Sequence, residues 1–470
     1  MYLWLICSAM LSIAWTAPII AGETLQYGPD TPIEWLHFNY HGDPRRPAML
    51  KTTVAIPTGQ GPFPLVVFNH GSNGKANEND MRNYERSMAT YYFLSRGYAV
   101  AQPLLRGYGG STGAPSFQDK CQFTEMAQDH GKDILAVIDQ LAENPKIDTR
   151  RTIMAGASFG GWNALAAGTL RDRRVKVVVN FYGGLRSVNC KASDVALRRG
   201  AGLLGKASKV PSIWFYGDND QLFPKPLWEA MYGAYVGAGG QAEMVAYGKF
   251  GTDSHRLLGN PAAFGVFVPR LDAFLKQHGF PAAITHPQYI PLEPPPASRY
   301  ADLDDVDALP FSTPRNREAY LAFLKSPRPR AFFIAAGRGT IGTSEGYDPL
   351  AQGYAECKQH GVTCRLYAFN DDVVWTYPSP PPAPTRFAAY EDADAIPYID
   401  AAGRTGYAKF RALPRPKAFV IAPNGAWMLA SGDLDAVGTA LERCGRVNPG
   451  CKPYAVDGHV VWPETAAASR

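Results

Sequence analysis

The chain contains little charge, and its small positive excess is not clustered. Only 19% of the 470 residues are charged, and 47 basic against 42 acidic side chains give a formal net charge of +5. No block of five or six consecutive basic residues occurs, so we do not expect a nucleic-acid partner. The hydrophobic share of 46% excludes wholesale disorder, collagen and a coiled coil, and the length predicts about three domains.

Charge is absent altogether from residues 1–22, of which residues 2–20 are mostly apolar. This pattern predicts a secretory signal peptide over residues 1–22 that is cleaved near Ala21. An uncleaved membrane anchor is the alternative, because the apolar stretch is long enough to span a bilayer. No later run of 18 apolar residues follows. We therefore expect a secreted or periplasmic protein with no membrane association after removal of the signal.

Cysteine is also scarce, with seven residues, and Cys7 lies in the predicted signal. The other six form an even set, which suits disulfides in an oxidising compartment. Zinc is the alternative, but two cysteines with six residues between them and no His pair nearby are a poor zinc site, so we expect no metal. The spacing favours the pairs Cys357–Cys364 and Cys444–Cys451, which leaves Cys121–Cys190.

Residues 23–280 are predicted to form an α/β domain, because short apolar runs alternate with helical patterns. Such alternation is typical of a mostly parallel sheet with helices on both faces. The expected strands are Ile33–Tyr40, Met49–Ile56, Phe63–Asn69, Gly97–Leu105, Thr152–Gly156, Val175–Phe181, Pro211–Tyr216 and Glu243–Tyr247. The expected helices are Phe123–Leu141, Asn163–Leu170, Pro226–Val236 and Ala263–Lys276.

The remainder of the chain contains an internal repeat. Residues 305–375 align with residues 392–462 at a constant offset of 87 without a gap, with 23 identities over 71 positions. Chance would give far fewer, so we expect duplicated α+β modules at 305–376 and 392–463. Proline-rich linkers are expected at 281–304 and 377–391. Each module should contain a helix, a strand, a second helix and a second strand.

The strongest chemical motif is Gly-Ala-Ser-Phe-Gly-Gly over residues 156–161. It follows a predicted strand and precedes a predicted helix, which is the setting of a nucleophile elbow. The flanking glycines are needed because side chains there would collide with the neighbouring strand and helix. The motif makes Ser158 the candidate nucleophile.

A serine nucleophile needs a base and an acid that orients the base. On this type of fold the acid follows the serine and the histidine comes last. His255 lies in a loop after the last predicted strand, and we take it as the base. Asp220 follows the strand Pro211–Tyr216 and is preferred over Asp218 as the acid, because Asp218 suits a turn.

Two backbone N–H groups should form the oxyanion hole. We expect them from Phe159, directly after the nucleophile, and from Ser72, in the loop after the strand Phe63–Asn69; a plain glycine turn is the alternative for this loop. Arg106 would either bind a substrate carboxylate or hold the glycine-rich turn that follows it. Arg186 lies in a basic segment, which would either contact an anionic substrate or form a solvated helix face.

These motifs resemble the α/β-hydrolase family. They comprise His70-Gly71-Ser72, the run Arg106–Gly113, the elbow, the run Gly217–Pro224 and His255. The likeness is to the secreted dienelactone-hydrolase-like and prolyl-oligopeptidase-like branches, and it implies that fold and a Ser-His-Asp mechanism. The dienelactone hydrolases proper have a cysteine where this chain has Ser158, and the peptidase branch carries a large partner domain that is missing here.

The sequence therefore predicts an exported serine hydrolase that acts on a small-molecule ester and needs no cofactor. A peptidase or amidase with the same triad is the first alternative. The second is a binding protein in which the C-terminal repeats carry the function. The sequence does not determine the oligomeric state.

Overall fold

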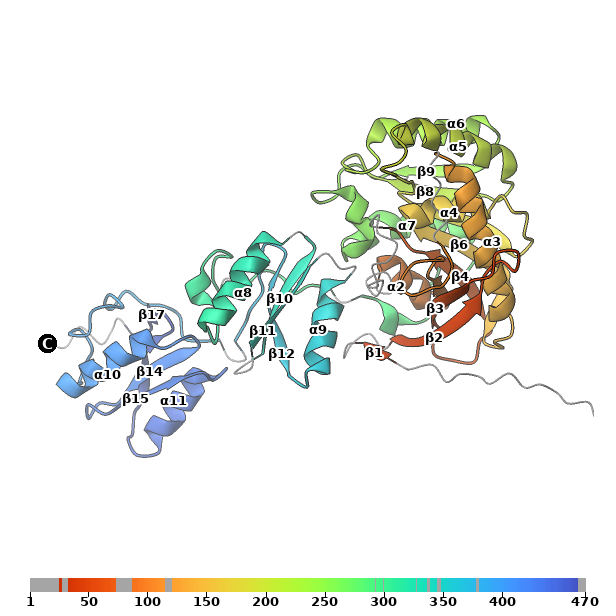
Figure 1. Ribbon diagram of the computed structural model, residues 1–470. Helices are drawn as coiled ribbons and strands as arrows, with labels where there is room; N and C mark the ends of the chain where they lie inside the picture. Colours follow the sequence, from red (N-terminus) through yellow and green to blue (C-terminus); the bar gives the residue numbers. More distant parts are fainter. Residues whose placement is uncertain are drawn as a thin grey trace, which may run out of the picture.

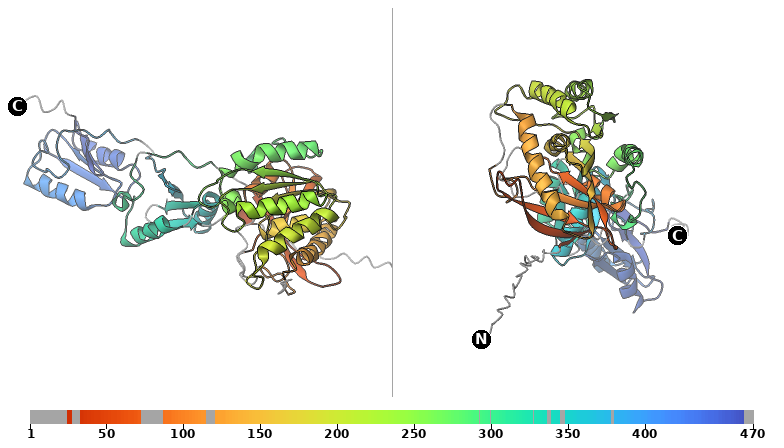
Figure 2. Two further views of the ribbon diagram at one scale, coloured as in Figure 1. Left: turned by 90° about the horizontal axis from the view of Figure 1, so that it is seen from above. Right: turned by 90° about the vertical axis from the view of Figure 1, so that its right-hand side faces the viewer.

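The computed structural model describes residues 25–27, 33–72, 87–114, 121–291, 293–298, 300–326, 328–335, 339–344, 348–377 and 380–463. The predicted signal peptide lies outside the described residues. Figure 1 shows three bodies in a row: a large α/β body, then a small sheet with helices, then a second small sheet with helices at the C-terminal end. The left view of Figure 2 shows the same order. In the described part of the chain, no helix is both long enough and apolar enough to cross a membrane.

The large body is built on a nine-stranded sheet with the order β1-β2-β3-β5-β4-β6-β7-β8-β9. The pairs from β1 to β5 are antiparallel, and every pair from β5 through β4 to β9 is parallel. The prediction of a mostly parallel sheet is confirmed. The strands are β1 (Leu25–Tyr27), β2 (Ile33–His41), β3 (Met49–Ala55), β4 (Phe63–Asn69), β5 (Ala99–Pro103), β6 (Ile147–Ala157), β7 (Val175–Phe181), β8 (Ser212–Tyr216) and β9 (Ala242–Ala246).

Helices cover both faces of this sheet, which is why all residues of β5 and β8 are buried. The helices form two groups. In one group α2 contacts α7; in the other α3 contacts α4 and α5, and α5 contacts α6. The helices are α2 (Met88–Ser95), α3 (Phe123–Leu141), α4 (Phe159–Ala167), α5 (Ser193–Ala207), α6 (Lys225–Gly237) and α7 (Ala263–Gln277), with the 3₁₀ helix η1 (Ser254–Gly259) before α7.

The two small bodies have the same topology. Their sheets are antiparallel, with the orders β11-β10-β12-β13 and β15-β14-β16-β17. The first contains η3 (Val306–Ala308), α8 (Pro314–Lys325), β10 (Arg330–Ala335), β11 (Gly339–Ser344), α9 (Pro349–Gln359), β12 (Cys364–Phe369) and β13 (Asp372–Val373). The second contains α10 (Ala401–Ala412), β14 (Lys417–Ile421), β15 (Trp427–Ser431), α11 (Ala436–Gly445), β16 (Lys452–Val456) and β17 (His459–Val460). The hairpin strands β11 and β15 were not predicted from the sequence.

Equivalent residues fill the cores of the two small bodies. At the offset of 87, the same register shift occurs between Phe332 and Phe333 in β10 and between Phe419 and Val420 in β14. The buried aromatic sets are Tyr320, Phe323, Phe332, Tyr367 and Trp375 in the first body, and Tyr407, Phe410, Phe419, Tyr454 and Trp462 in the second. The similar sequence is thus matched by a similar packing of rings.

The proline-rich segment after α7 is fixed to the large body. The N–H groups of Thr285 and His286 both donate to Ser95 O at 2.9 Å. Tyr289, in the short helix η2 (Pro287–Tyr289), is buried, and its hydroxyl accepts a hydrogen bond from Thr58 N at 3.1 Å. Farther along, Tyr300 packs against the core of the first small body. The connection is therefore anchored on both sides.

Candidate active site

Ser158 occupies a sharp turn between β6 and α4. Its backbone has φ 55° and ψ −124°, a left-handed conformation that is unusual for a residue with a side chain. The turn is possible only with glycines around it: a Cβ on Gly156 would lie 2.3 Å from Gly160 O, and a Cβ on Gly160 would lie 1.9 Å from Asn69 O. These contacts explain the glycines of the motif and leave the hydroxyl at the carboxyl end of the strand.

The elbow is held by backbone hydrogen bonds to the next strand and loop. Ser158 N donates to Phe181 O of β7 at 3.0 Å, and Gly184 N donates to Ser158 O at 3.1 Å. The turn is therefore part of the sheet and not a free loop, which keeps the hydroxyl in one place.

The structure brings Ser158, His255 and Asp220 together at the carboxyl edge of the parallel strands. Ser158 Oγ lies 2.9 Å from His255 Nε2, and Asp220 Oδ2 lies 2.9 Å from His255 Nδ1. The three residues follow β6, β9 and β8, whose carboxyl ends lie at the same edge of the sheet, where open α/β folds place their ligands. The distances are those of a nucleophile, a base and an orienting acid.

Asp220 is fixed in the orientation that this arrangement needs. Its side chain is fully buried, and Oδ1 accepts hydrogen bonds from Leu222 N at 2.8 Å and Phe223 N at 2.7 Å. Oδ2 is thereby directed at the imidazole. Asp218 is instead partly exposed and pairs with Lys225 at 3.2 Å, so it does not reach the histidine.

Asp253 ties the acid loop to the histidine loop, a role that the sequence analysis missed. Its Oδ1 accepts hydrogen bonds from His255 N at 3.0 Å and from Gln221 N at 3.1 Å. The bond to His255 N could have been predicted from the sequence, because an Asp at the start of a helix typically caps an N–H group two or three residues later. The bond across the loops was not readable, since 32 residues separate the partners.

Aromatic rings form a wall beside the imidazole. The Tyr182 ring lies 4.7 Å from the His255 ring and the Phe223 ring lies 5.4 Å from it. Arg186 is half-exposed above Phe223, at 5.9 Å from the ring centre, and is tied by Nε to Leu222 O at 3.0 Å and by an ion pair to Asp194. Arg186 thus lies at the rim of the histidine site, already paired with a carboxylate.

The loop after β4 approaches the first turn of α4. The carbonyls of Asn69 and His70 lie so close to Gly160 that a Cβ there would clash with both. Farther along, Ser72 Oγ lies 3.4 Å from Tyr108 OH, and the Tyr108 ring lies 6.3 Å from the ring of Phe159. Tyr108 thus neighbours both Ser72 and Phe159, the two residues from which the oxyanion donors are expected.

His70 stabilises this loop. It is fully buried, and burial lowers its pKa to about 4, so the ring is neutral. Its Nε2 accepts a hydrogen bond from Leu105 N at 3.0 Å, which leaves the proton on Nδ1 to be donated to Gly71 O at 2.6 Å. The ring links the end of β4 to the end of β5 and is not a second base.

Arg106 does not point to a free ligand site. Its guanidinium is almost completely buried and makes two hydrogen bonds to Asp133 of α3, at 2.7 Å from Nε and 2.6 Å from Nη2. Nη2 also donates to Arg46 O at 2.7 Å. These bonds favour the structural alternative over substrate binding and correct the substrate-binding assignment of Arg106. The partner in α3 could not be identified from the sequence.

The six cysteines outside the predicted signal form three disulfides. They join Cys121 to Cys190, Cys357 to Cys364 and Cys444 to Cys451. The first links the start of α3 to the segment before α5. The other two link the second helix of each small body to the start of the strand that follows it: Cys364 is the first residue of β12, and Cys451 directly precedes β16.

The large body has a match among protein families. Residues 48–221 match the family model described as X-Pro dipeptidyl-peptidase of the S15 family. The matched span contains Ser158 and Asp220 and ends before His255. No match was found among curated proteins.

Several solved structures are similar to the chain at low identity. The acylaminoacyl peptidase of Pyrococcus horikoshii is 18% identical over 52% of this chain and 41% of that chain, with a TM-score of 0.38. A putative dienelactone hydrolase from Klebsiella pneumoniae subsp. pneumoniae is 18% identical over 45% of this chain and 85% of that chain, with a TM-score of 0.33. The acetyl xylan esterase from Paenibacillus sp. R4 is 20% identical over 56% of this chain and 89% of that chain, with a TM-score of 0.38. The chain thus spans about two fifths of the length of the acylaminoacyl peptidase.

The sheet order, the elbow and the family match agree on the type of domain. The large body is an α/β-hydrolase domain of the serine-hydrolase type.

Proposed function

We propose that this protein is an exported serine hydrolase that cleaves a carboxylic ester through an acyl-enzyme intermediate. The observation that carries the proposal is the continuous hydrogen-bond chain from Ser158 Oγ through His255 to Asp220. The three disulfides and the charge-free N-terminal segment support export.

In the first half of the reaction, His255 Nε2 takes the proton of Ser158 as Oγ attacks the ester carbonyl. Asp220 accepts the hydrogen bond from Nδ1, which selects the tautomer with a free Nε2 and stabilises the imidazolium that forms. The imidazolium then gives its proton to the leaving alcohol, which leaves the acyl group on Ser158.

The negative charge of the tetrahedral intermediate develops beside the first turn of α4. The N–H of Phe159 belongs to the start of a helix, where N–H groups have no partner within the helix. Together with the N–H of Ser72 it would receive the oxyanion. Water activated by His255 then hydrolyses the acyl-enzyme through the same steps in reverse.

Replacement of the nucleophile tests this proposal directly. Ser158→Ala should lower the kcat for p-nitrophenyl butyrate by about 10⁶-fold and abolish labelling by a fluorophosphonate, with unchanged circular dichroism. Ser187→Ala is the control, because this serine lies in the segment next to Arg186 and should retain activity and labelling. Turnover that persists in Ser158→Ala would remove the assignment.

A peptidase or amidase with the same residues is the second candidate, and the match to an X-Pro dipeptidyl-peptidase family favours it. The triad serves both reactions, so the substrate must decide. Matched ester and anilide substrates, including Ala-Pro-p-nitroanilide, should show a higher kcat/KM for the esters if the esterase proposal is correct. A higher kcat/KM on the dipeptidyl anilide would favour the peptidase.

The C-terminal modules are proposed to be accessory. The α/β-hydrolase domain has its own continuous core, which includes residues from Ile33 to Tyr289. A chain that ends at residue 298 should therefore retain esterase activity on p-nitrophenyl butyrate. Loss of activity in a folded truncated chain would make the modules part of the active site, and a catalytically silent full chain would favour the binding-protein alternative.

A further inference from the structure

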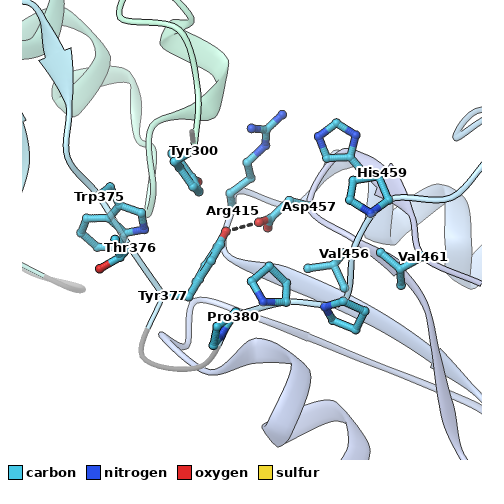
Figure 3. A pocket seen from close by; sticks show the side chains of 13 residues that line it. Tyr300, Trp375, Thr376, Tyr377, Pro380, Arg415, Val456, Asp457, His459 and Val461 are labelled. Carbon is cyan, nitrogen blue, oxygen red and sulfur yellow. Dashed lines mark hydrogen bonds between the residues drawn. The ribbon is translucent and has the colours of Figure 1, made fainter. Parts of the chain in front are cut away.

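A pocket of about 480 Å³ opens between the two C-terminal modules, far from Ser158 in the chain. Figure 3 shows the rings of Tyr300, Trp375 and Tyr377 on one side and the prolines of the linker below them, with Arg415 and Asp457 of the second module opposite. The volume lies within the range of about 300–1,000 Å³ that small-ligand sites occupy. Such a lining suits a ligand with a flat, apolar body.

Arg415 places a positive charge in this pocket, and the two modules differ in whether this arginine has a carboxylate partner. In the first module, the guanidinium of Arg328 pairs with Asp371, and Arg330 pairs with the same carboxylate at 3.3 Å. The equivalent of Arg328 at the offset of 87 is Arg415, but the equivalent of Asp371 is Gly458. Arg415 lies over this glycine, since a Cβ there would be 3.0 Å from Nη2. The second module has kept the arginine and lost its carboxylate.

Among the residues that the structure describes, Arg415 consequently has no ion-pair partner. In the ranges that the structure describes, no carboxylate oxygen lies within 4.0 Å of its guanidinium. Its neighbour is the hydroxyl of Tyr300, whose pKa burial raises to about 12 while the charge of Arg415 opposes the rise. An arginine beside aromatic rings can pair with an anion in two parallel hydrogen bonds.

Asp457 does not supply the missing partner. Its Oδ1 accepts a hydrogen bond from Lys417 N at 2.9 Å, and its Oδ2 accepts one from the hydroxyl of Tyr377. Burial raises the pKa of this carboxyl, and the hydrogen bonds from Tyr377 and Lys417 N and the charges of Arg415 and Lys417 oppose the rise. Figure 3 shows the Arg415 side chain directed away from the Asp457–Tyr377 pair. The carboxylate therefore fixes the linker to the second module, while Arg415 lines the pocket and forms no ion pair with Asp457.

We propose that this pocket binds a small aryl carboxylate, whose carboxylate group pairs with Arg415 and whose ring lies among the aromatic and proline side chains. This site is separate from the triad and does not depend on the proposed esterase activity. A cationic ligand is disfavoured by Arg415, and a neutral aryl ligand would leave the guanidinium unpaired.

The test uses the full-length protein, 2-naphthoate as the probe and 2-naphthamide as its neutral counterpart, with binding measured by isothermal titration calorimetry. Wild-type protein should bind the carboxylate at least about tenfold more tightly than the amide. Arg415→Gln should remove this preference and leave the weak binding of the amide unchanged. Arg328→Gln is the matched control, because it changes the equivalent residue of the first module, and it should bind 2-naphthoate like the wild type.

A second pair of variants restores the ion pair of the first module. Gly458 has no positive φ, so a side chain fits its backbone. Gly458→Asp should place a carboxylate next to Arg415 and weaken 2-naphthoate binding about tenfold or more. Gly458→Asn adds nearly the same volume without the charge and should retain most of the affinity. Thermal unfolding of each variant would reveal any loss of fold.

Three results would overturn the proposal. The first is equal affinity of wild-type protein for 2-naphthoate and 2-naphthamide, or no saturable binding at millimolar ligand. The second is unchanged 2-naphthoate binding in folded Arg415→Gln or Gly458→Asp. The third is loss of binding after fluorophosphonate labelling of Ser158, which would place the ligand in the active site. A failure of the esterase proposal gives none of these results.

Discussion

Replacement of Asp220 by Asn separates the orienting role of this carboxylate from its part in the fold. Oδ1 of the side chain accepts hydrogen bonds from Leu222 N and Phe223 N at 2.8 and 2.7 Å, and an amide oxygen can retain both. The amide nitrogen then faces His255 Nδ1, where Oδ2 was 2.9 Å away. A donor at this position requires Nδ1 to be an acceptor, which puts the ring proton on Nε2. The imidazole can then no longer take the proton of Ser158.

We expect Asp220→Asn to lower kcat by about 10⁴-fold, the effect of a wrong tautomer in a Ser-His-Asp triad, while KM changes little. The assay is the steady-state hydrolysis of p-nitrophenyl butyrate, with urea unfolding as the measure of stability. Asp218→Asn is the control in the same loop, because the partly exposed Asp218 pairs with Lys225 and not with His255, and its kcat should stay within about twofold. A kcat for Asp220→Asn within tenfold of the wild type, or an equal loss in Asp218→Asn, would refute the reasoning.

Three further changes test the packing. Gly160→Ala should prevent folding, because its Cβ would lie 1.9 Å from a carbonyl oxygen. Gly233→Ala in α6 is the control: its Cβ meets nothing within 4 Å, and it should raise the free energy of unfolding in urea by about 0.5–1 kcal/mol. A soluble and active Gly160→Ala protein would contradict this reasoning. Replacement of Cys121 and Cys190 by Ser should lower that free energy by about 4 kcal/mol, since their bond spans 69 residues, and a loss below about 1 kcal/mol would argue against the loop-entropy estimate. Burial lowers the pKa of His130 to about 4, so the unfolded chain takes up the proton first as the pH falls from about 6.5 towards 4. The free energy of unfolding should therefore decrease over that range, by up to about 3 kcal/mol from this residue. Urea titrations at several pH values should show a smaller dependence on pH in His130→Gln than in the wild type. An unchanged dependence would exclude His130 as the cause.

The elements that the sequence predicted well have a strong periodic signal. The helix expected at Phe123–Leu141 has the bounds of α3, because its apolar residues recur at helical spacing and are buried. The apolar run Phe63–Asn69 is β4, whose last five residues are all buried. In both cases the local pattern and the final environment agree, which makes a prediction from local sequence possible.

The elements that were missed lack such a signal. All eight residues of α2 are buried, so no polar face marks the helix. The strand β11 has the sequence Gly-Thr-Ile-Gly-Thr-Ser, in which glycines interrupt the alternation, and it is defined by its pairing with β10. Contacts between residues far apart in the chain could not be predicted for the same reason. Neither the pairing of Arg106 with Asp133 nor the hydrogen bond between Asp253 and Gln221 can be read from the local sequence.

The two C-terminal modules differ at the turn that borders the pocket. The residues Tyr-Ala before it and Val-Val-Trp after it are identical in both copies, but the four residues between them are Phe-Asn-Asp-Asp at 369–372 and Val-Asp-Gly-His at 456–459. Three of the four in the second copy, Val456, Asp457 and His459, line the pocket, and the fourth is the glycine beneath Arg415. The flanking residues are buried in the core of each module, so packing is a sufficient reason for their identity. The turn of the second copy borders the pocket, and through Asp457 it also holds Tyr377 at the start of the linker, so its residues have contacts beyond the core of their own module.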